Sequence, residues 1–312
     1  MNSIAALPKG RTEHVIFFGT PEIAVGPLRA LVAAGFTVDL VVTGVDKRRG
    51  RGSQTSPSPV KQAAIELQLP VTHEVSDAIA LVASSDAKFA GSYVGVVVAY
   101  GHIISSEALQ VLPMINIHYS LLPRWRGAAP VERALLAGDE QTGVCIMQVV
   151  EQLDAGDILS SATTQISQTD TTTTLRSRLG EIANPMLIEV LSNGVSTTQP
   201  QSGDIVVAAK ITQADLEIDW SKPAAVIDRQ VRVGGAFTFF HDKRFKIHSL
   251  KVSTEIFIAK PGNMVAVNDR VLVACGQGVV ELVEIQPEGK PRISAQDWKK
   301  GARLDAQSRL GS

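Results

Sequence analysis

The chain has 312 residues, of which 45% are hydrophobic and 20% are charged, an ordinary composition for a globular protein. Its length suggests two domains. Thirty basic residues against 31 acidic ones give a formal net charge of -1, which excludes a strongly basic nucleic-acid-binding chain. No run approaches the roughly 20 apolar residues of a membrane helix, and residues 1–13 lack the apolar core of a signal peptide. We therefore expect a cytoplasmic protein with no membrane segment.

The first strand–helix–strand unit predicts a parallel, doubly wound sheet. His14–Gly19 is a continuous apolar run that ends in glycine, as is typical of a strand buried on both faces. Thr20 is predicted to cap the following helix, with Pro21 at its first position and Gly35 at its end. Val38–Thr43 is the second buried strand. The turn after the first strand lacks G-x-G-x-x-G, and no P-loop motif occurs elsewhere, so nicotinamide and P-loop chemistry are disfavoured.

Residues 44–59 are unlike the apolar segments on either side. They contain four basic residues interspersed with glycines: Lys47, Arg48, Arg49 and Arg51. Composition alone favours a solvated loop, because charge runs are usually just solvated. The alternative is a flexible cationic arm that closes over a phosphate backbone.

Strands and helices continue to alternate up to residue 195. Strands are predicted at Leu69–Val75, Gly95–His102, Met114–His118, Gly143–Val150 and Ile158–Ile166. Helices are predicted at Val60–Leu67, Asp77–Ser84, Ile104–Leu112 and Val131–Ala137. A further long helix is predicted to be capped by Asp170 and to end near Asn193 and Gly194. This alternation predicts an α/β fold.

A second region follows Ser196–Gly203, which is rich in Ser, Thr, Gln and Pro and is predicted to be a linker. Short strands are predicted beyond it, around one helix at Ala224–Val233: Ile205–Ala208, Phe237–Phe240, Val265–Val267, Val271–Ala274 and Val279–Ile285. Several short strands in about 100 residues predict a small barrel.

The two cysteines, Cys145 and Cys275, each lie in an apolar run and are expected to be buried thiols. Because they are not closely spaced, neither a zinc site nor a redox dithiol is predicted. The six histidines are scattered, and no H-E-x-x-H occurs, so no metal is expected.

The stretch from Asn116 to Pro130 has the clearest features of a site. Asn116 and His118 lie two apart at the end of an apolar run, so their side chains face the same side of a strand. Polar groups there are costly unless they have partners or a function, and ligands of open α/β sheets bind beyond the carboxyl ends of the strands. The stretch therefore predicts a strand end that enters an active site.

Asp154 follows a later strand and is predicted to reach His118, because a parallel sheet gathers its strand ends at one edge. Ser120 lies outside any G-x-S-x-G, so a covalent acyl-transfer triad is not predicted. Asn116 and His118 would instead donate hydrogen bonds to an oxyanion. Asp154 would keep the imidazole protonated or take a proton from an attacking amine. This set suits direct acyl transfer between two bound substrates.

Each of these residues also has an ordinary structural interpretation. Asn116 would satisfy a loop, His118 would be packed or solvent-facing, and Asp154 would cap a turn. The residue pattern alone leaves both interpretations open.

Short motifs are spread over about residues 13–304. They are Phe18–Glu22, Gly50–Gly52, Pro57–Lys61, Val98–Gly101, Asn116-x-His118, Ser120–Pro130, Gly143–Met147, Leu153–Asp157, Ile218–Trp220 and Leu282–Lys290. Together they resemble the methionyl-tRNA formyltransferase family. The Asn, His, Ser-Leu-Leu-Pro and Asp set alone marks the broader 10-formyltetrahydrofolate transferases and hydrolases, and the Arg51 loop and C-terminal region narrow it to the tRNA enzymes.

The resemblance implies a Rossmann-like formyltransferase domain at residues 1–195, a linker at 196–208 and an OB-like β-barrel domain that binds tRNA at 209–312. It implies transfer of formyl from 10-formyltetrahydrofolate to the α-amine of methionyl initiator tRNA, for translation initiation. We also expect the chain to be a monomer that uses no metal.

The resemblance also assigns roles to residues. The catalytic positions are Asn116, His118 and Asp154. The folate-binding segments match Tyr100, Gly101, Ser120, Leu121, Leu122 and Pro123. The loop that meets the tRNA acceptor end matches Arg51, with Lys47, Arg48 and Arg49 beside it, and this favours the cationic arm over the solvated loop.

Two alternatives remain from the sequence. One is another formyl-folate enzyme, acting on a sugar-nucleotide amine or a purine precursor, whose substrate recognition would not need residues 204–312. The other is a noncatalytic RNA-binding protein with the same fold. Arg124, Trp125 and Arg126 would contact folate or tRNA, or simply pack the turn.

Overall fold

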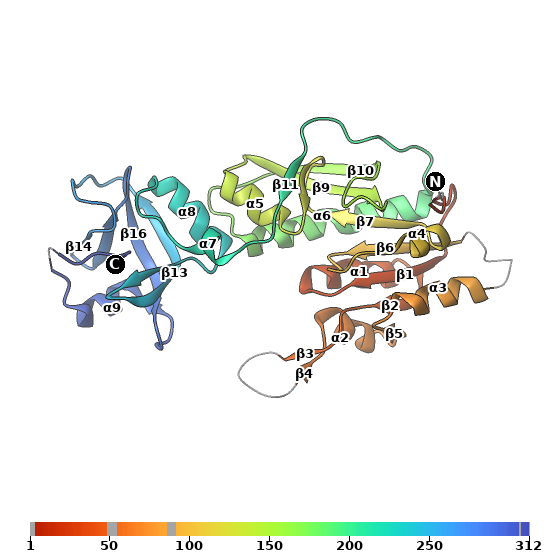
Figure 1. Cartoon of the computed structure of the whole chain (residues 1–312), viewed down its shortest axis with the longest axis horizontal. Coiled ribbons are helices and arrows are strands. Elements are labelled where there is room, and N and C mark those ends of the chain that lie inside the picture. The colour runs from red at the N-terminus through yellow and green to blue at the C-terminus, as the bar shows by residue number, and fades with distance from the viewer. Residues whose placement is uncertain (1–3, 49–54, 86–91, 306, 312) are drawn as a thin grey trace. The chain divides into compact units, whose positions relative to one another are not determined.

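The computed structural model describes residues 4–48, 55–85, 92–305 and 307–311, and they form two compact units (Figure 1). Unit 1 comprises Met1–Pro130, Gln141–Gln165 and Arg176–Ala208. Unit 2 comprises Val131–Glu140, Ile166–Leu175 and Ala209–Ser312.

Unit 1 contains a seven-stranded sheet with the order β10-β9-β7-β6-β1-β2-β5. The strands are β1 His14–Gly19, β2 Thr37–Val42, β5 Val71–Thr72, β6 Tyr93–Val98, β7 Met114–His118, β9 Gln141–Gln148 and β10 Ile158–Gln165. The five strands from β5 to β7 run parallel in a doubly wound order, whereas β9 and β10 are antiparallel additions at one edge. The predicted Rossmann-like doubly wound sheet is therefore confirmed, with an antiparallel edge that the sequence did not indicate.

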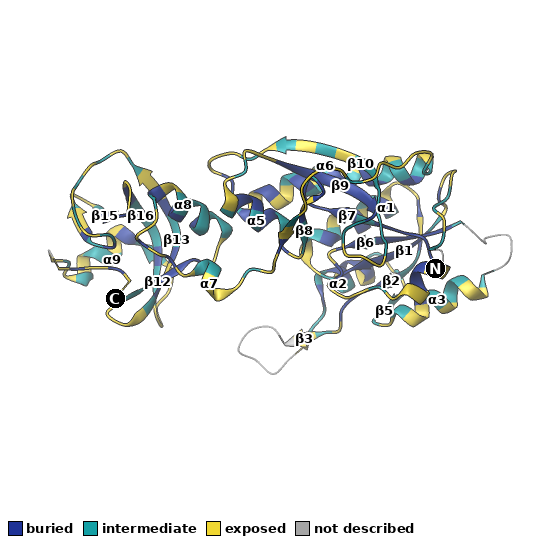
Figure 2. Cartoon of the chain, turned by 45° about the horizontal axis from the view of Figure 1, so that its top comes forward, coloured by how far each residue is buried: buried dark blue, intermediate teal, exposed yellow. Residues whose placement is uncertain are grey.

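Helices cover both faces of this sheet (Figure 2). The helices of unit 1 are η1 Glu22–Ala24, α1 Val25–Ala33, α2 Pro59–Glu66, α3 Val75–Ser84, α4 Ser106–Val111 and most of α6 Thr172–Asn193. Helix α5 Pro130–Ala137 belongs to unit 2 except for its first residue. Ile16 and Phe18 of β1 pack with residues of α3 and α4, while Val15 and Phe17, which point to the opposite face, are also fully buried. Burial on both faces explains why the first apolar run shows no alternation.

Thr20 has a different role from the predicted helix cap. Its Oγ1 donates a hydrogen bond to the carbonyl of Tyr100 at 3.2 Å and accepts one from the backbone N–H of Gly44 at 3.1 Å. The short η1 follows, and α1 begins only at Val25. Thr20 therefore joins the segments after β1, β2 and β6 at the point where the strand order reverses, which is the usual ligand-binding edge of such sheets.

Residues 196–208, which we call the strap, are held against unit 1. Gln199 forms an antiparallel bridge with Ile158, with N···O distances of 2.9 and 2.8 Å. Further along, β11 Val206–Ala208 pairs in parallel with β8 Arg124–Gly127, directly after the predicted site residues of β7.

Unit 2 contains an antiparallel sheet with the order β12-β13-β16-β15-β14, to which β17 adds on β16. Its elements are α7 Gln213–Leu216, α8 Ala224–Val233, β12 Phe237–Phe240, β13 Lys243–Ser253, β14 Met264–Val267, β15 Arg270–Ala274, β16 Val279–Pro287, β17 Ile293–Ser294 and α9 Ala295–Ala302. The predicted OB-like C-terminal domain is confirmed by this architecture.

The longest strand of unit 2, β13, was not predicted. Its buried residues begin with a period of two, at Phe245 and Ile247, but the next one is Leu250 because the register shifts around Ser249. Lysines occupy three of its exposed positions, Lys243, Lys246 and Lys251, and Val252 is exposed as well, so neither a continuous apolar run nor a regular alternation is present.

Neither cysteine forms a disulfide, and both are buried, as predicted. Burial raises the pKa of Cys275 to about 11 and that of Cys145 above its ordinary value, so both thiols stay protonated and unreactive at neutral pH. Among the described residues, no helix is long and apolar enough to cross a membrane. The same residues hold no cluster of three His, Cys, Asp or Glu side chains that would bind a metal ion.

Candidate active site

His118, the last residue of β7, is 5% exposed and held in one orientation. Its Nε2 lies 2.8 Å from the backbone carbonyl oxygen of Trp125, and its Nδ1 lies 3.6 Å from Oδ2 of Asp154. A carbonyl oxygen only accepts hydrogen bonds, so Nε2 carries a proton and donates it. Nδ1 is therefore the ring nitrogen that remains for chemistry, and it lies beside a carboxylate.

Asp154 lies in the loop between β9 and β10 with a φ of +49°, a left-handed conformation that is uncommon for a residue other than glycine. Its Oδ2 accepts a hydrogen bond from the N–H of Gly127 at 2.8 Å. Its Oδ1 makes no hydrogen bond to any described residue. One oxygen of this largely buried carboxylate therefore has unused accepting capacity.

Asp154 reaches His118 by a route that differs from the prediction. β9 runs antiparallel to β7, with Cys145 opposite His118 and Gln148 opposite Ile115. The end of β9 therefore lies beside the beginning of β7, not beside its end. The β9–β10 loop has to fold back along the sheet to bring Asp154 to His118. The predicted proximity of the two residues is therefore found, but the predicted cause, parallel strands that end at one edge, is wrong.

Asn116 lies two residues before His118 on β7, and its backbone pairs with Val97 and Met147 on the neighbouring strands. The residue is partly exposed, and its side-chain amide makes no hydrogen bond to the described residues. The amide is thus not used to satisfy a loop there, which was the structural interpretation of this residue.

The turn after β7 supplies the backbone groups that orient the pair. Trp125 is buried with a φ of +66°, and its carbonyl orients His118. Two residues later, the backbone N–H of Gly127 orients Asp154. Ser120 is fully buried and donates its hydroxyl to the carbonyl of Arg124 at 2.6 Å, which closes the turn. Two of the three residues left unassigned from the sequence, Arg124 and Trp125, supply these two carbonyls from the start of β8.

The residues assigned to folate binding are mostly inside the protein. Tyr100 is 5% exposed and its ring meets that of Phe18 edge to face, with centroids 5.6 Å apart, so its side chain belongs to the core. Gly101 is exposed and has a φ of +81°. In the turn, Ser120, Leu122 and Pro123 are buried, and Leu121 is partly exposed. In this segment a ligand would meet Gly101, Leu121 and backbone atoms.

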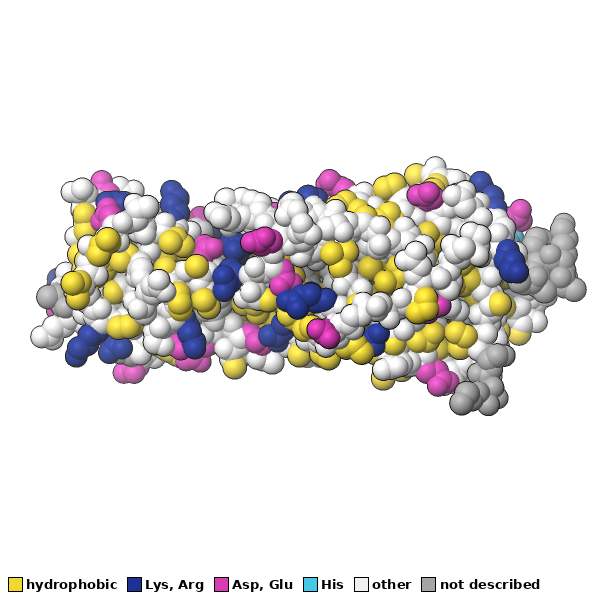
Figure 3. Space-filling view, turned by 90° about the horizontal axis from the view of Figure 1, so that it is seen from above, with side chains coloured by type: hydrophobic (Ala, Val, Ile, Leu, Met, Phe, Trp, Pro, Cys, Tyr) yellow, Lys and Arg dark blue, Asp and Glu magenta, His cyan; other side chains and the backbone are white. Residues whose placement is uncertain are grey.

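The predicted tRNA-binding residues are described only in part, since Arg49 and Arg51 lie outside the described residues. Lys47 is exposed on β3 Lys47–Arg48, which pairs with β4 Thr55–Ser56. Basic and acidic side chains are interspersed on the face of the protein shown in Figure 3, in keeping with the near-zero net charge. A cationic arm would therefore act locally, not as part of a protein-wide field.

Residues 13–191 match the formyl transferase family, and residues 210–303 match the formyl transferase C-terminal domain. The chain belongs to the formyl transferase family. It is 39% identical to the methionyl-tRNA formyltransferase of Methylococcus capsulatus over 314 residues, which cover 96% of this chain and all of that protein. Its identity to the methionyl-tRNA formyltransferase of Corynebacterium diphtheriae is 40%, over 92% of this chain and 96% of that protein.

Solved structures of distant sequence share the formyl transferase fold. HypX from Aquifex aeolicus, in complex with tetrahydrofolic acid, has a TM-score of 0.63 at 15% identity and covers 94% of this chain and 47% of its own. WlaRD, a sugar 3N-formyl transferase, has a TM-score of 0.62 at 15% identity and covers 90% of this chain and all of its own. At such identities the likeness shows the fold alone.

Proposed function

We propose that this formyl transferase moves the formyl group of 10-formyltetrahydrofolate to the α-amine of methionyl initiator tRNA, for translation initiation. The observation that carries the proposal is the near-full-length identity of 39–40% to proteins named methionyl-tRNA formyltransferase. Residues 1–195 carry the reaction, 196–208 connect the domains, and 209–312 contribute tRNA contacts. The enzyme is a cytoplasmic monomer.

The oxyanion is stabilised by Asn116 and His118. 10-Formyltetrahydrofolate supplies an activated formyl carbon, and attack by the methionyl amine places negative charge on the formyl oxygen. The unused amide of Asn116 and a protonated Nδ1 of His118 donate hydrogen bonds to that oxygen, and each such donor typically contributes about 10²–10³ in rate. Nε2 of His118 takes no part, because it is bound to the carbonyl of Trp125.

Asp154 completes the proton balance. The new bond joins the amine nitrogen to the formyl carbon, the bond from that carbon to the folate nitrogen breaks, and one proton passes from the amine to the folate nitrogen. Asp154 has an unused oxygen that accepts the proton directly or through a water, and its charge stabilises a protonated imidazole at 3.6 Å. No covalent enzyme intermediate is needed.

The deciding experiment is a formyl-transfer assay with 10-formyltetrahydrofolate and four acceptors: methionyl initiator tRNA, the uncharged tRNA, methionyl elongator tRNA and a sugar-nucleotide amine. We expect transfer only to methionyl initiator tRNA. Transfer to the sugar amine without tRNA would replace the proposal with a small-molecule formyltransferase. Binding of tRNA with no transfer to any acceptor would identify a noncatalytic RNA-binding protein.

Arg51 tests the proposed cationic arm separately from the chemistry. Arg51→Ala should weaken the use of charged tRNA while leaving the affinity for folate unchanged, because the arm contacts phosphates. Binding of tRNA to the parent enzyme should also fall as salt concentration rises, since phosphate contacts release counterions. A loss of folate affinity, or tRNA binding that ignores salt, would remove the arm from the tRNA interface.

A further inference from the structure

One glutamine of the strap binds both segments that orient the catalytic pair. Nε2 of Gln201 donates hydrogen bonds to the carbonyl of Asp154 at 2.9 Å and to that of Gly156 at 2.8 Å. Its Oε1 accepts from Nε and Nη2 of Arg126, at 2.9 and 2.6 Å. Both amide hydrogens and the amide oxygen are therefore used, and each bond crosses between segments that are far apart in the sequence.

Arg126 connects this glutamine to the turn that follows β7. It lies on β8 between Trp125, whose carbonyl binds His118, and Gly127, whose N–H binds the carboxylate of Asp154. The Gln201–Arg126 pair thus joins β8 to the β9–β10 loop at the place where these two segments orient the two catalytic side chains.

The β9–β10 loop needs such support at Asp154, because a left-handed backbone at a residue other than glycine is disfavoured and persists only where its surroundings fix it. The carbonyl of this residue is one of the two that Gln201 binds. The strap also holds the end of the loop, where Thr198 donates its hydroxyl to Asp157 at 2.8 Å and Gln199 bridges Ile158.

We propose that Gln201 is a positioning residue for the formyl-transfer reaction. It touches neither substrate in this assignment, and it fixes Asp154 relative to His118 through the loop backbone and through Arg126. The inference rests on the proposed function for its kinetic effect, but the positioning itself is measurable without turnover.

The sharpest variant is Gln201→Glu, which has nearly the same shape. It keeps acceptors for Arg126 but replaces the amide donor with an oxygen that faces the carbonyls of Asp154 and Gly156. We expect kcat for formyl transfer to fall on the order of 10- to 100-fold, with little change in KM, because small displacements of catalytic groups have effects of this size. Gln201→Ala should lower kcat by a similar factor. The matched control Gln199→Ala should leave kcat unchanged, since Gln199 has an exposed side chain and forms its hydrogen bonds through its backbone.

The outcomes separate positioning from plain folding. The imidazole nitrogen NMR signals of His118 should shift in Gln201→Glu, and the pH profile of kcat should move, whereas a merely structural role would lower the amount of folded enzyme and leave both unchanged. Wild-type kcat in Gln201→Glu, or unshifted His118 signals, would overturn the inference. A parent enzyme that transfers no formyl group while Gln201→Glu still shifts those signals would overturn the proposed function and leave the positioning role standing.

Discussion

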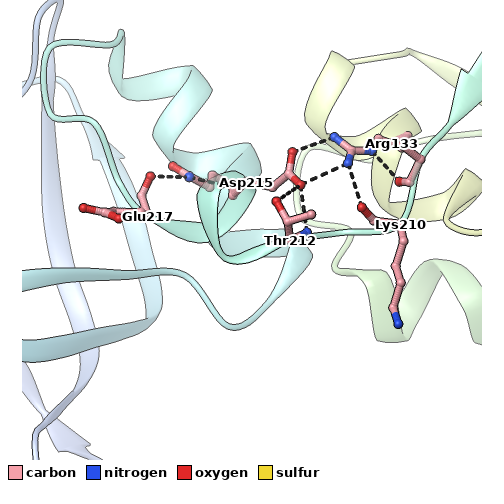
Figure 4. A network of polar contacts seen from close by, with 7 residues as sticks. Arg133, Lys210, Thr212, Asp215 and Glu217 are labelled. Carbon is pink, nitrogen blue, oxygen red and sulfur yellow. Dashed lines mark hydrogen bonds and ion pairs between the residues drawn. The ribbon is translucent and has the colours of Figure 1, made fainter.

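Asp154 of unit 1 and Asp215 of unit 2 both join distant segments, but they use their oxygens differently. Asp215 accepts from Nη1 and Nη2 of Arg133 at 2.7 and 3.0 Å, and from the N–H and hydroxyl of Thr212, both at 2.8 Å (Figure 4). Asp154 accepts one backbone N–H and faces His118 at 3.6 Å. A carboxylate with every oxygen occupied serves structure, whereas one with an unused oxygen beside an imidazole is available for proton transfer.

The same contrast extends to a glutamine beside each carboxylate. Gln230 donates to the carbonyls of Asp215 and Glu217, at 2.8 and 2.9 Å, just as Gln201 binds the carbonyl of Asp154 and the one two residues later. In unit 2 this device braces a bound Asp–Arg pair (Figure 4). In unit 1 it braces an aspartate in a left-handed conformation beside His118. The device is therefore general, and its surroundings decide what it supports.

The largest expected difference is in kcat for formyl transfer, between the variants Asp154→Asn and Asp215→Asn. Both substitutions remove one negative charge and keep the side-chain size. Asp154→Asn should lower kcat for formyl transfer at least 10²- to 10³-fold because the proton acceptor is lost, and His118→Ala should do likewise. Asp215→Asn should leave kcat per folded molecule unchanged. Near-normal turnover in purified, folded Asp154→Asn would end the assignment.

Gly156→Ala should have the next largest effect. A Cβ at this position would lie 1.9 Å from the carbonyl oxygen of Gln148, so the β9–β10 loop has to move and Asp154 moves with it. We expect a loss of about 2–4 kcal/mol in the free energy of unfolding together with a large fall in kcat. Gly180→Ala is the control, because nothing lies within 4 Å of its Cβ and alanine favours the helix. Full activity in Gly156→Ala would show that the loop position is not critical.

Arg133→Ala tests the structural side of the comparison. Arg133 binds Asp215 and also donates to the carbonyls of Ala209 and Lys210, at 2.8 and 3.2 Å. Its removal should lower stability in urea denaturation by about 1–3 kcal/mol, with kcat per folded molecule preserved. The exposed pair of Lys222 and Asp219, 3.9 Å apart, supplies the control, since Lys222→Ala should cost little. Equal losses of stability in the two variants would show that Arg133 contributes no more than an exposed ion pair.

Acid unfolding should show the smallest effect. Hydrogen bonds from Arg133 lower the pKa of Asp215 from its ordinary value of 3.8 to about 2. A depressed folded-state pKa adds stability that is complete above the unfolded value and is lost as the pH falls from 3.8 toward 2. The free energy of unfolding should therefore fall more steeply over this range in the parent protein than in Asp215→Asn, which lacks the titrating carboxylate. An identical pH dependence in the two proteins would contradict the structural role of this carboxylate.

The sequence by itself determined the elements whose patterns are local. The predicted bounds of Met114–His118, Ala224–Val233 and Phe237–Phe240 agree with β7, α8 and β12, because a helix or strand imposes its own period on the residues that it buries. The spacing of Asn116 and His118 places both on one face of β7 for the same reason.

Only the tertiary structure decided how the site is held. Three features of the site left no mark in the sequence. They are the carbonyl of Trp125 that orients His118, the N–H of Gly127 that binds Asp154, and the antiparallel direction of β9. Gln201 lies in a polar segment that composition indicates as a linker, and it gave no signal either. The physical reason is that nearly every residue carries the same backbone donor and acceptor, so a long-range bond to the backbone is specified by where the chain passes and not by which residue is there.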